Sequence, residues 1–158
     1  MPNSRILSDD IVDLARRVIT ENAALGRKVT VAESCTGGLV SAALTSIAGS
    51  SSVFEAGYVT YSNDAKMDML QVDSNILETF GAVSIATAWA MAQGALMRSG
   101  ADVAVAITGI AGPEGGSEQK PVGTVVFARA QKDADPEDVI ADTRQFEDTG
   151  RGAIRRQA

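Results

Sequence analysis

The amino-acid sequence predicts an α/β protein in which helices pack against a sheet, and three observations lead to this prediction. Residues 28–47 read as a strand, a glycine turn and an apolar helix in direct succession. Residues 102–108 (DVAVAIT) form an almost continuous apolar run, which is typical of a strand buried on both faces of an α/β sheet. Hydrophobic residues make up 45% of the chain but aromatic residues only 4%, which favours a core of small aliphatic side chains.

The first third of the chain contains a helix, a strand and a second helix. Apolar residues recur at helical spacing after Ser8, a residue type that favours helix N-termini, and this helix should end near Gly26. Residues 28–33 (KVTVAE) alternate like a strand, and the turn 34–38 (SCTGG) leads into a helix over 39–47. Such a junction points backbone N–H groups at an anion or a developing oxyanion, although it is also a common tight turn.

The middle of the chain contains a strand and three helical segments. Residues 54–61 (FEAGYVTY) have the composition of a strand. Ser62 can cap a helix over 63–70, residues 74–80 form a short helical turn, and Ser84 can cap a long helix that runs to Arg98.

The last third contains three strands, a glycine-rich loop and a helix. The loop 109–116 (GIAGPEGG) follows the apolar strand 102–108 directly, so it is either a wall of a ligand site or a surface loop. Residues 122–130 and 139–146 read as an antiparallel hairpin, and a final helix begins at Arg151 and is still in progress where the sequence stops.

Composition limits the classes of function. We expect a single domain over residues 1–158, with a net charge of −6 that argues against a nucleic-acid partner. A single cysteine cannot form an internal disulfide, the N-terminus lacks the pattern of a secretion signal, and no apolar run approaches the roughly 20 residues of a membrane span. The expected location is cytoplasmic, without a membrane partner.

One stretch, residues 48–66, gathers hydroxyls, a phenol and an ammonium group around a short strand. The chain has no histidine, so a Ser-His-Asp triad is excluded. A lysine kept neutral by burial can replace histidine as the base in acyl transfer, and Ser51, Tyr61 and Lys66 fit such a site. We expect Lys66 to be buried, with its amine within hydrogen-bond reach of the Ser51 and Tyr61 hydroxyls. The alternative is a serine-rich turn, an edge strand and a solvated lysine.

Three segments resemble the CinA C-terminal domain family: residues 32–38 (AESCTGG), residues 48–66 (AGSS, then YSN and a lysine) and residues 107–125 (ITGIAGPEGGSEQKPVGTV). The resemblance implies a three-layer α/β/α sandwich with a mixed, mostly parallel central sheet, and a homodimer. It also implies hydrolysis of the carboxamide of nicotinamide mononucleotide, giving nicotinate mononucleotide and ammonia without a cofactor.

The resemblance also implies roles for single residues. By position in the motifs, Ser51 resembles the nucleophile, Lys66 its base and Tyr61 the third catalytic residue. Arg151 is similar in position to an arginine that meets the nucleotide phosphate, but the register before the last helix departs from the family, which leaves Arg144 and Arg155 as alternatives. No metal is expected, and the further substrate-binding residues are Glu33, Cys35, Thr36, Gly37, Gly38, Ser50, Thr108, Gly109 and Gly112.

Two other hypotheses remain open at this point. Glu33, Cys35 and Lys66 are the residue types of a Cys-Glu-Lys amidase, in which a cysteine at a helix N-terminus would have a lowered pKa. The family name is also connected with competence and DNA damage, so the chain could be a non-catalytic binding module.

Overall fold

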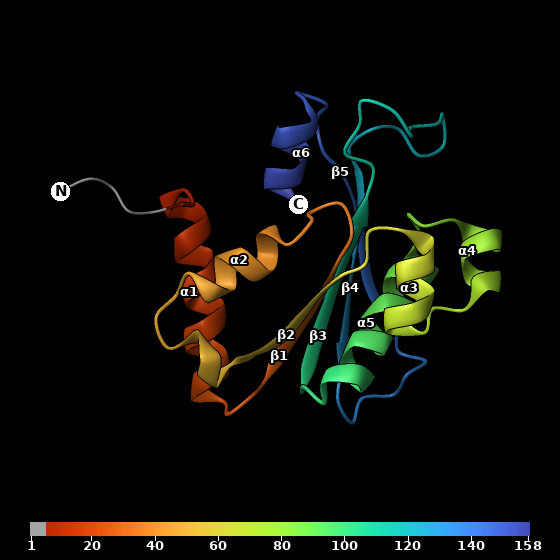
Figure 1. Ribbon diagram of the computed structural model, residues 1–158. Helices are drawn as coiled ribbons and strands as arrows, with labels where there is room; N and C mark the ends of the chain where they lie inside the picture. Colours follow the sequence, from red (N-terminus) through yellow and green to blue (C-terminus); the bar gives the residue numbers. More distant parts are fainter. Residues whose placement is uncertain (1–5) are drawn as a thin grey trace.

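The computed structural model describes residues 6–158 (Figure 1). The elements in this part of the chain are α1 (Asp9–Ala24), β1 (Val29–Glu33), α2 (Leu39–Thr45), the 3-10 helix η1 (Ser50–Ser52), β2 (Phe54–Val59), α3 (Asn63–Leu70), α4 (Ser74–Phe80), α5 (Ile85–Ser99), β3 (Val103–Gly109), β4 (Thr124–Gln131), β5 (Ile140–Gln145) and α6 (Arg151–Gln157). These bounds confirm the predicted helices and strands to within a few residues. No helix within residues 6–158 is both long and apolar enough to cross a membrane.

The strands of this region form one sheet in the order β2-β1-β3-β4-β5. β1 is parallel to both of its neighbours, β2 and β3, whereas β4 is antiparallel to β3 and to β5. Four strands therefore run in one direction and β4 runs against them, which confirms a mixed sheet. The predicted hairpin is formed by β4 and β5.

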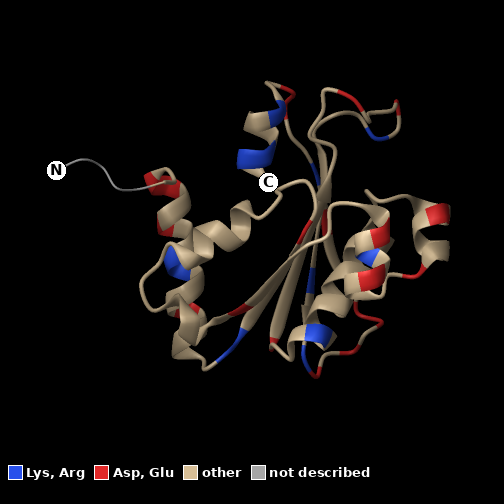
Figure 2. Ribbon diagram, in the orientation of Figure 1, with Lys and Arg blue, Asp and Glu red and all other residues tan. Residues whose placement is uncertain are grey.

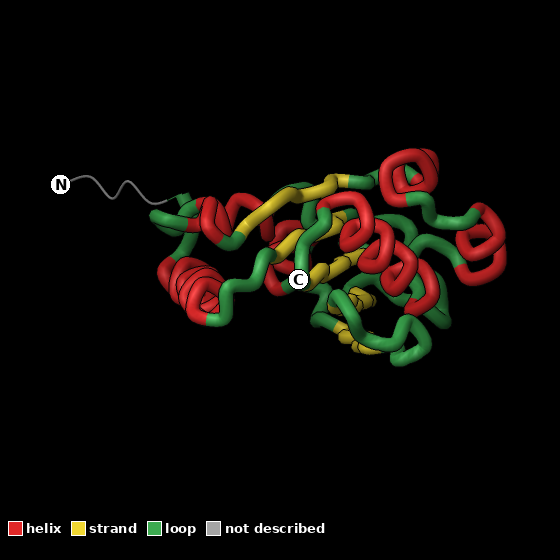
Figure 3. The backbone as a smooth tube through the Cα atoms, turned by 90° about the horizontal axis from the view of Figure 1, so that it is seen from below, coloured by secondary structure: helices red, strands yellow, loops and turns green. Residues whose placement is uncertain are grey.

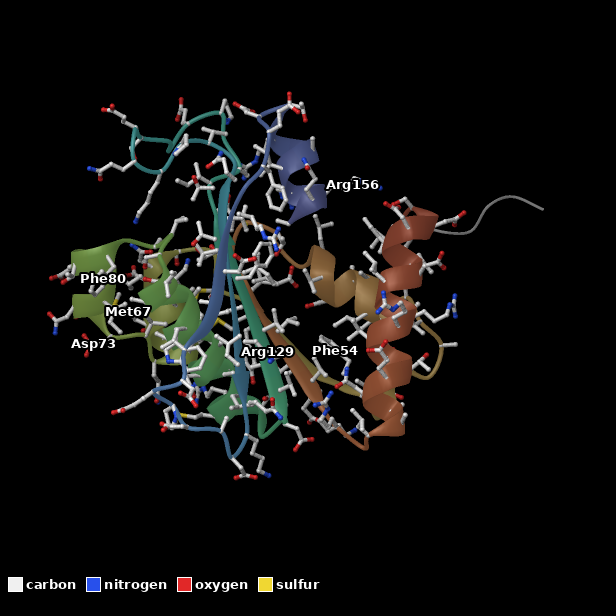
Figure 4. All side chains as sticks on the ribbon, turned by 180° about the vertical axis from the view of Figure 1, so that it is seen from behind. Phe54, Met67, Asp73, Phe80, Arg129 and Arg156 are labelled. Atoms are coloured by element: carbon white, nitrogen blue, oxygen red, sulfur yellow. The ribbon has the colours of Figure 1, made fainter. Side chains whose placement is uncertain are left out.

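Helices cover both faces of this sheet, which gives three layers (Figure 3). On one face, α1 and α2 pack against β1 through apolar residues that include Ile19, Leu44 and Val31. On the other face, α5 lies closest to the sheet and α3 packs against α5. Figure 4 shows Phe54 on the α1 side and Met67 on the α3 side. The small residues of β3 and α5 allow this close packing, as the low aromatic content predicts.

Two of the three serines predicted to cap helices, Ser62 and Ser84, do so, and Ser8 does not. The Ser62 hydroxyl accepts a hydrogen bond from the Ala65 amide (3.0 Å), and the Ser84 hydroxyl accepts one from the Thr87 amide (3.1 Å). Ser8 precedes α1 but forms no such bond with it; its hydroxyl instead accepts a hydrogen bond from the guanidinium of Arg156 (3.1 Å). Ser8 therefore helps to join α6 to α1.

Candidate active site

Ser34 follows β1 directly and Gly109 ends β3, so both lie at the edge where the parallel strands have their carboxyl ends. Open α/β sheets bind ligands at this edge. A cavity of about 240 Å³ opens there. Two larger hollows, of about 470 and 870 Å³, have mostly apolar linings and lie elsewhere. The smaller cavity is lined by Ser34, Cys35, Tyr61, Lys66, Ala82, Val83, Thr108, Gly109, Ile110, Ala111, Gly112, Glu114, Gly115 and Arg151.

Lys66 is the buried cation of this cavity, with 1% of its surface exposed. Ser62 caps α3, which places Lys66 in the first turns of the helix beneath the end of β2. The Lys66 amine donates to the Ser34 hydroxyl (3.1 Å) and to the backbone carbonyls of Thr60 (2.9 Å) and Tyr61 (3.2 Å). Burial lowers the pKa of Lys66, because the charged form loses solvation. The structure therefore agrees with the expectation of a buried lysine.

The structure does not bring Ser51 to this amine. Ser51 is exposed in η1, before β2 begins, whereas Lys66 lies beyond the end of that strand. The six residues of β2 separate the two positions by about 20 Å at the usual rise of a strand. The Ser51 carbonyl instead accepts a hydrogen bond from Lys28 (3.4 Å), and Ser50 shares this remote position. Ser34 occupies the place beside the lysine that the sequence assigned to Ser51.

Tyr61 lies beside Lys66 through its backbone and not through its phenol. Its side chain is exposed, and its hydroxyl accepts a hydrogen bond from Arg151 Nη2 (2.7 Å). The expected contact between the phenol and the lysine amine is therefore replaced by a contact with Arg151. Tyr61 therefore contacts both cationic residues of the cavity, Lys66 through its backbone carbonyl and Arg151 through its hydroxyl.

Glu33 is a completely buried carboxylate on which five hydrogen bonds converge within the described chain. Oε1 accepts from the Thr36 hydroxyl (2.6 Å) and from the amides of Gly38 (3.2 Å) and Val40 (3.0 Å). Oε2 accepts from the Ser41 amide (3.0 Å) and hydroxyl (2.7 Å). Glu33 therefore receives the free N–H groups at the start of α2, as a capping side chain does.

The turn 36–38 donates hydrogen bonds to Glu33 and does not line the cavity. The Thr36 hydroxyl and the Gly38 amide both point at this carboxylate, and the Gly37 amide donates to the Ser34 carbonyl (3.1 Å). Gly38 has a φ of 103°, which L side chains rarely adopt, and this conformation brings its amide to the carboxylate. The predicted role of these three residues as a wall of the site is not supported by their positions, because none of them belongs to the described lining.

Cys35 lines the cavity, but its thiol is not activated. The residue is 5% exposed, and burial raises the pKa of its thiol to about 11. The sequence-based expectation of a lowered pKa was wrong, because the N–H groups at the start of α2 are bound to Glu33 and the thiol is desolvated. With the Glu33 oxygens also occupied, the geometry does not favour a Cys-Glu-Lys site.

The strand β3 and the loop after it form the second wall of the cavity. Thr108, Gly109 and Gly112 all belong to the lining. The buried Thr108 hydroxyl donates to the carbonyl of Ala82 (2.8 Å), which holds the segment before α5 against this wall. That these residues contact a substrate remains a prediction.

The three candidate arginines have different surroundings. Arg151 belongs to the lining, and its Nη1 donates to the Gly112 carbonyl (2.6 Å). Arg155 binds the carbonyls of Cys35 (3.0 Å) and Thr36 (3.3 Å), and Arg144 pairs with a neighbouring carboxylate on the exposed strand β5. Figure 2 shows that α6 carries basic residues and no acidic ones. Arg151 is therefore the arginine that faces the cavity.

Sequence reasoning missed Ser34 and Glu114 as lining residues. A signal for Ser34 was present, because it is the first residue after a strand whose carboxyl end lies at the expected ligand edge. Glu114 is one residue of the glycine-rich loop, and nothing in the spacing distinguishes it from the other polar residues there.

Comparisons with known proteins agree on one family. The model of the CinA C-terminal domain matches residues 11–158. A nicotinamide-nucleotide amidohydrolase, PncC of Enterobacter agglomerans, is 53% identical over 135 residues, which cover 85% of this chain and 80% of that protein. A CinA-like protein of Mycolicibacterium gilvum is 59% identical over 108 residues, or 68% of this chain and 26% of that protein.

The solved structures support the same assignment. The competence/damage inducible protein CihA from Agrobacterium tumefaciens has a TM-score of 0.91 and 53% identity, with 97% of this chain and 91% of that chain covered. A CinA superfamily protein from Escherichia coli has a TM-score of 0.87 and 36% identity, with 98% of this chain and 88% of that chain covered. The chain therefore belongs to the CinA C-terminal domain family.

Proposed function

We propose that the protein hydrolyses the carboxamide of nicotinamide mononucleotide to nicotinate mononucleotide and ammonia, with Ser34 as the nucleophile. The observation that carries this proposal is the buried Lys66 amine bonded to the Ser34 hydroxyl inside a cavity that also contains Arg151. The name of the PncC relative, a nicotinamide-nucleotide amidohydrolase, supports the reaction and its substrate.

Ser34 and Lys66 divide the chemistry between them. Lys66 in its neutral form removes the proton from the Ser34 hydroxyl as the oxygen attacks the amide carbon. The resulting ammonium group then gives this proton to the departing nitrogen, which leaves as ammonia, and water hydrolyses the acyl-serine in a second step. A lowered pKa of Lys66 supports this role, because it raises the neutral fraction above that of a free lysine.

The tetrahedral intermediate needs donors for its oxyanion. We assign this role to backbone N–H groups at the cavity end of the turn, beginning with Cys35, because they adjoin the nucleophile. The amides of Gly37 and Gly38, which the sequence suggested for this purpose, are bound to other acceptors.

Arg151 supplies the other end of the substrate site. A guanidinium can bind a phosphate with two parallel hydrogen bonds, and Arg151 combines this geometry with a place in the cavity lining. The Tyr61 hydroxyl lies against the guanidinium, so we place Tyr61 alongside the substrate between the amide and phosphate ends. The homodimer implied by the family and the cytoplasmic location expected from the sequence remain predictions.

An assay of ammonia release tests the proposal. The substrates are nicotinamide mononucleotide, nicotinamide riboside, free nicotinamide and the dinucleotide, with the products separated by chromatography. The expected result is turnover of the mononucleotide with its glycosidic bond intact. Free nicotinamide as the product, or no turnover of any of the four compounds, would contradict the proposal.

A further inference from the structure

The cavity contains one carboxylate among its described lining residues, that of Glu114. The other charged side chains of the lining are Lys66 and Arg151. Within residues 6–158, Glu114 forms no hydrogen bond and no ion pair, and the residue is exposed at the cavity. Both of its oxygens are therefore free to accept hydrogen bonds from a ligand.

The loop that carries Glu114 is held on both sides of it. On one side, the Gly112 carbonyl accepts a hydrogen bond from Arg151 (2.6 Å). On the other, Lys120 donates to the carbonyl of Phe80 at the end of α4 (2.8 Å), and the Ser117 amide donates to the Lys120 carbonyl (2.9 Å). These contacts fix the position of the loop backbone at the cavity, which lowers the entropic cost of binding through its side chains.

The chemistry of a carboxylate restricts what it can bind. An ionised carboxylate is negatively charged and accepts hydrogen bonds without donating any, so it repels a phosphate and binds only donors or cations, which in this nucleotide are the carboxamide N–H groups, the pyridinium ring and the ribose hydroxyls. Of these we assign the ribose hydroxyls to Glu114, because the amide is already placed at the Lys66 end and acidic side chains bind ribose hydroxyls in other α/β nucleotide sites. In the nucleotide the ribose lies between the carboxamide and the phosphate, and Glu114 lines the same cavity as Lys66 and Arg151, to which we assign these two ends.

We propose that Glu114 accepts hydrogen bonds from the ribose hydroxyls of the nucleotide and so selects ribonucleotides over their 2′-deoxy analogues. This inference rests on the proposed function for the position of the ribose. It assigns a specificity-determining role to a residue that touches the sugar and not the reacting amide.

Binding measurements test this role without requiring turnover. The ligands are nicotinate mononucleotide, which has no amide to hydrolyse, and its 2′-deoxy analogue, each titrated by calorimetry into the wild type and Glu114→Ala. Glu118→Ala is the matched control, because Glu118 lies on the same loop but outside the described cavity lining. A lost hydrogen bond to a charged acceptor should weaken binding of the ribonucleotide about tenfold or more.

The pattern across the two ligands decides the outcome. We expect Glu114→Ala to weaken binding of the ribonucleotide more than binding of the deoxy analogue, which keeps only the 3′-hydroxyl, and we expect Glu118→Ala to behave like the wild type. An equal loss for both ligands would show that Glu114 does not read the 2′-hydroxyl and would overturn the proposal, as would no loss at all. A wild type that binds the ribonucleotide with this selectivity but releases no ammonia would contradict the proposed function alone.

Discussion

Replacement of Glu33 tests whether this carboxylate holds the turn that carries Ser34. In Glu33→Ala, the amides of Gly38, Val40 and Ser41 lose their acceptor inside the protein. Each unsatisfied buried donor costs about 1–3 kcal/mol, although the removal of a buried carboxylate offsets part of the loss. The expected net destabilisation is about 3–5 kcal/mol, which is typical of breaking a buried charged network.

Thermal unfolding measures this loss. For a chain of this size, 1 kcal/mol corresponds to about 2–4 °C, so the Tm of Glu33→Ala should fall by about 6–20 °C. Glu33→Gln keeps one acceptor oxygen and should lie between this variant and the wild type. Glu55→Ala is the control, because Glu55 is exposed on β2, and its stability should stay within about 0.5 kcal/mol of the wild type.

Two results would refute this reasoning. A loss of less than about 1 kcal/mol in Glu33→Ala would show that the turn does not depend on the carboxylate. A Glu33→Gln variant with wild-type stability and no turnover would show that Glu33 acts in the chemistry, as the Cys-Glu-Lys hypothesis requires.

Three further predictions concern other residues. Cys35 should react with iodoacetamide about 100-fold more slowly than a free thiol, because its pKa near 11 leaves little thiolate. Mass spectrometry measures the labelling rate, and a rate equal to that of glutathione would contradict this prediction. Gly94→Ala should lower the stability to urea by about 1–3 kcal/mol despite the better helix propensity of alanine, since a Cβ at this position would collide with the Leu70 carbonyl; a stabilised variant would contradict the packing. Turnover should rise with pH up to the lowered pKa of Lys66, because only the neutral amine acts as the base. The contribution of Lys66 to folding stability is largest above its unfolded pKa of about 10.4 and declines as the pH falls toward the lowered pKa of the folded state. Activity in Lys66→Arg would show that the residue is not the base.

The local features of the fold could be predicted from the sequence because they depend on neighbouring residues. The apolar run of β3, the glycine turn after β1 and the capping serines at Ser62 and Ser84 each have a local cause, and the structure confirms them. The side-chain contact that Ser8 makes with α6 could not be foreseen, because 148 residues separate it from Arg156.

The partner of Lys66 shows why the candidate site was harder to predict than the fold. Ser51 is closer to Lys66 in sequence than Ser34 is, but β2 runs between Ser51 and the lysine, whereas β1 and β2 are parallel and end at the same edge. The order of strands in the sheet, which the spacing of residues does not reveal, therefore decides which serine meets the amine. The same applies to Cys35, whose pKa depends on burial that a motif does not report.

The two serines provide the most direct test of the account. Ser34→Ala and Ser51→Ala are compared with the wild type by ammonia release from nicotinamide mononucleotide. Loss of the nucleophile should lower kcat by more than about 1,000-fold in Ser34→Ala, while Ser51→Ala keeps turnover close to that of the wild type. An inactive Ser51→Ala beside an active Ser34→Ala would contradict the assignment of Ser34 and Lys66 as the catalytic pair.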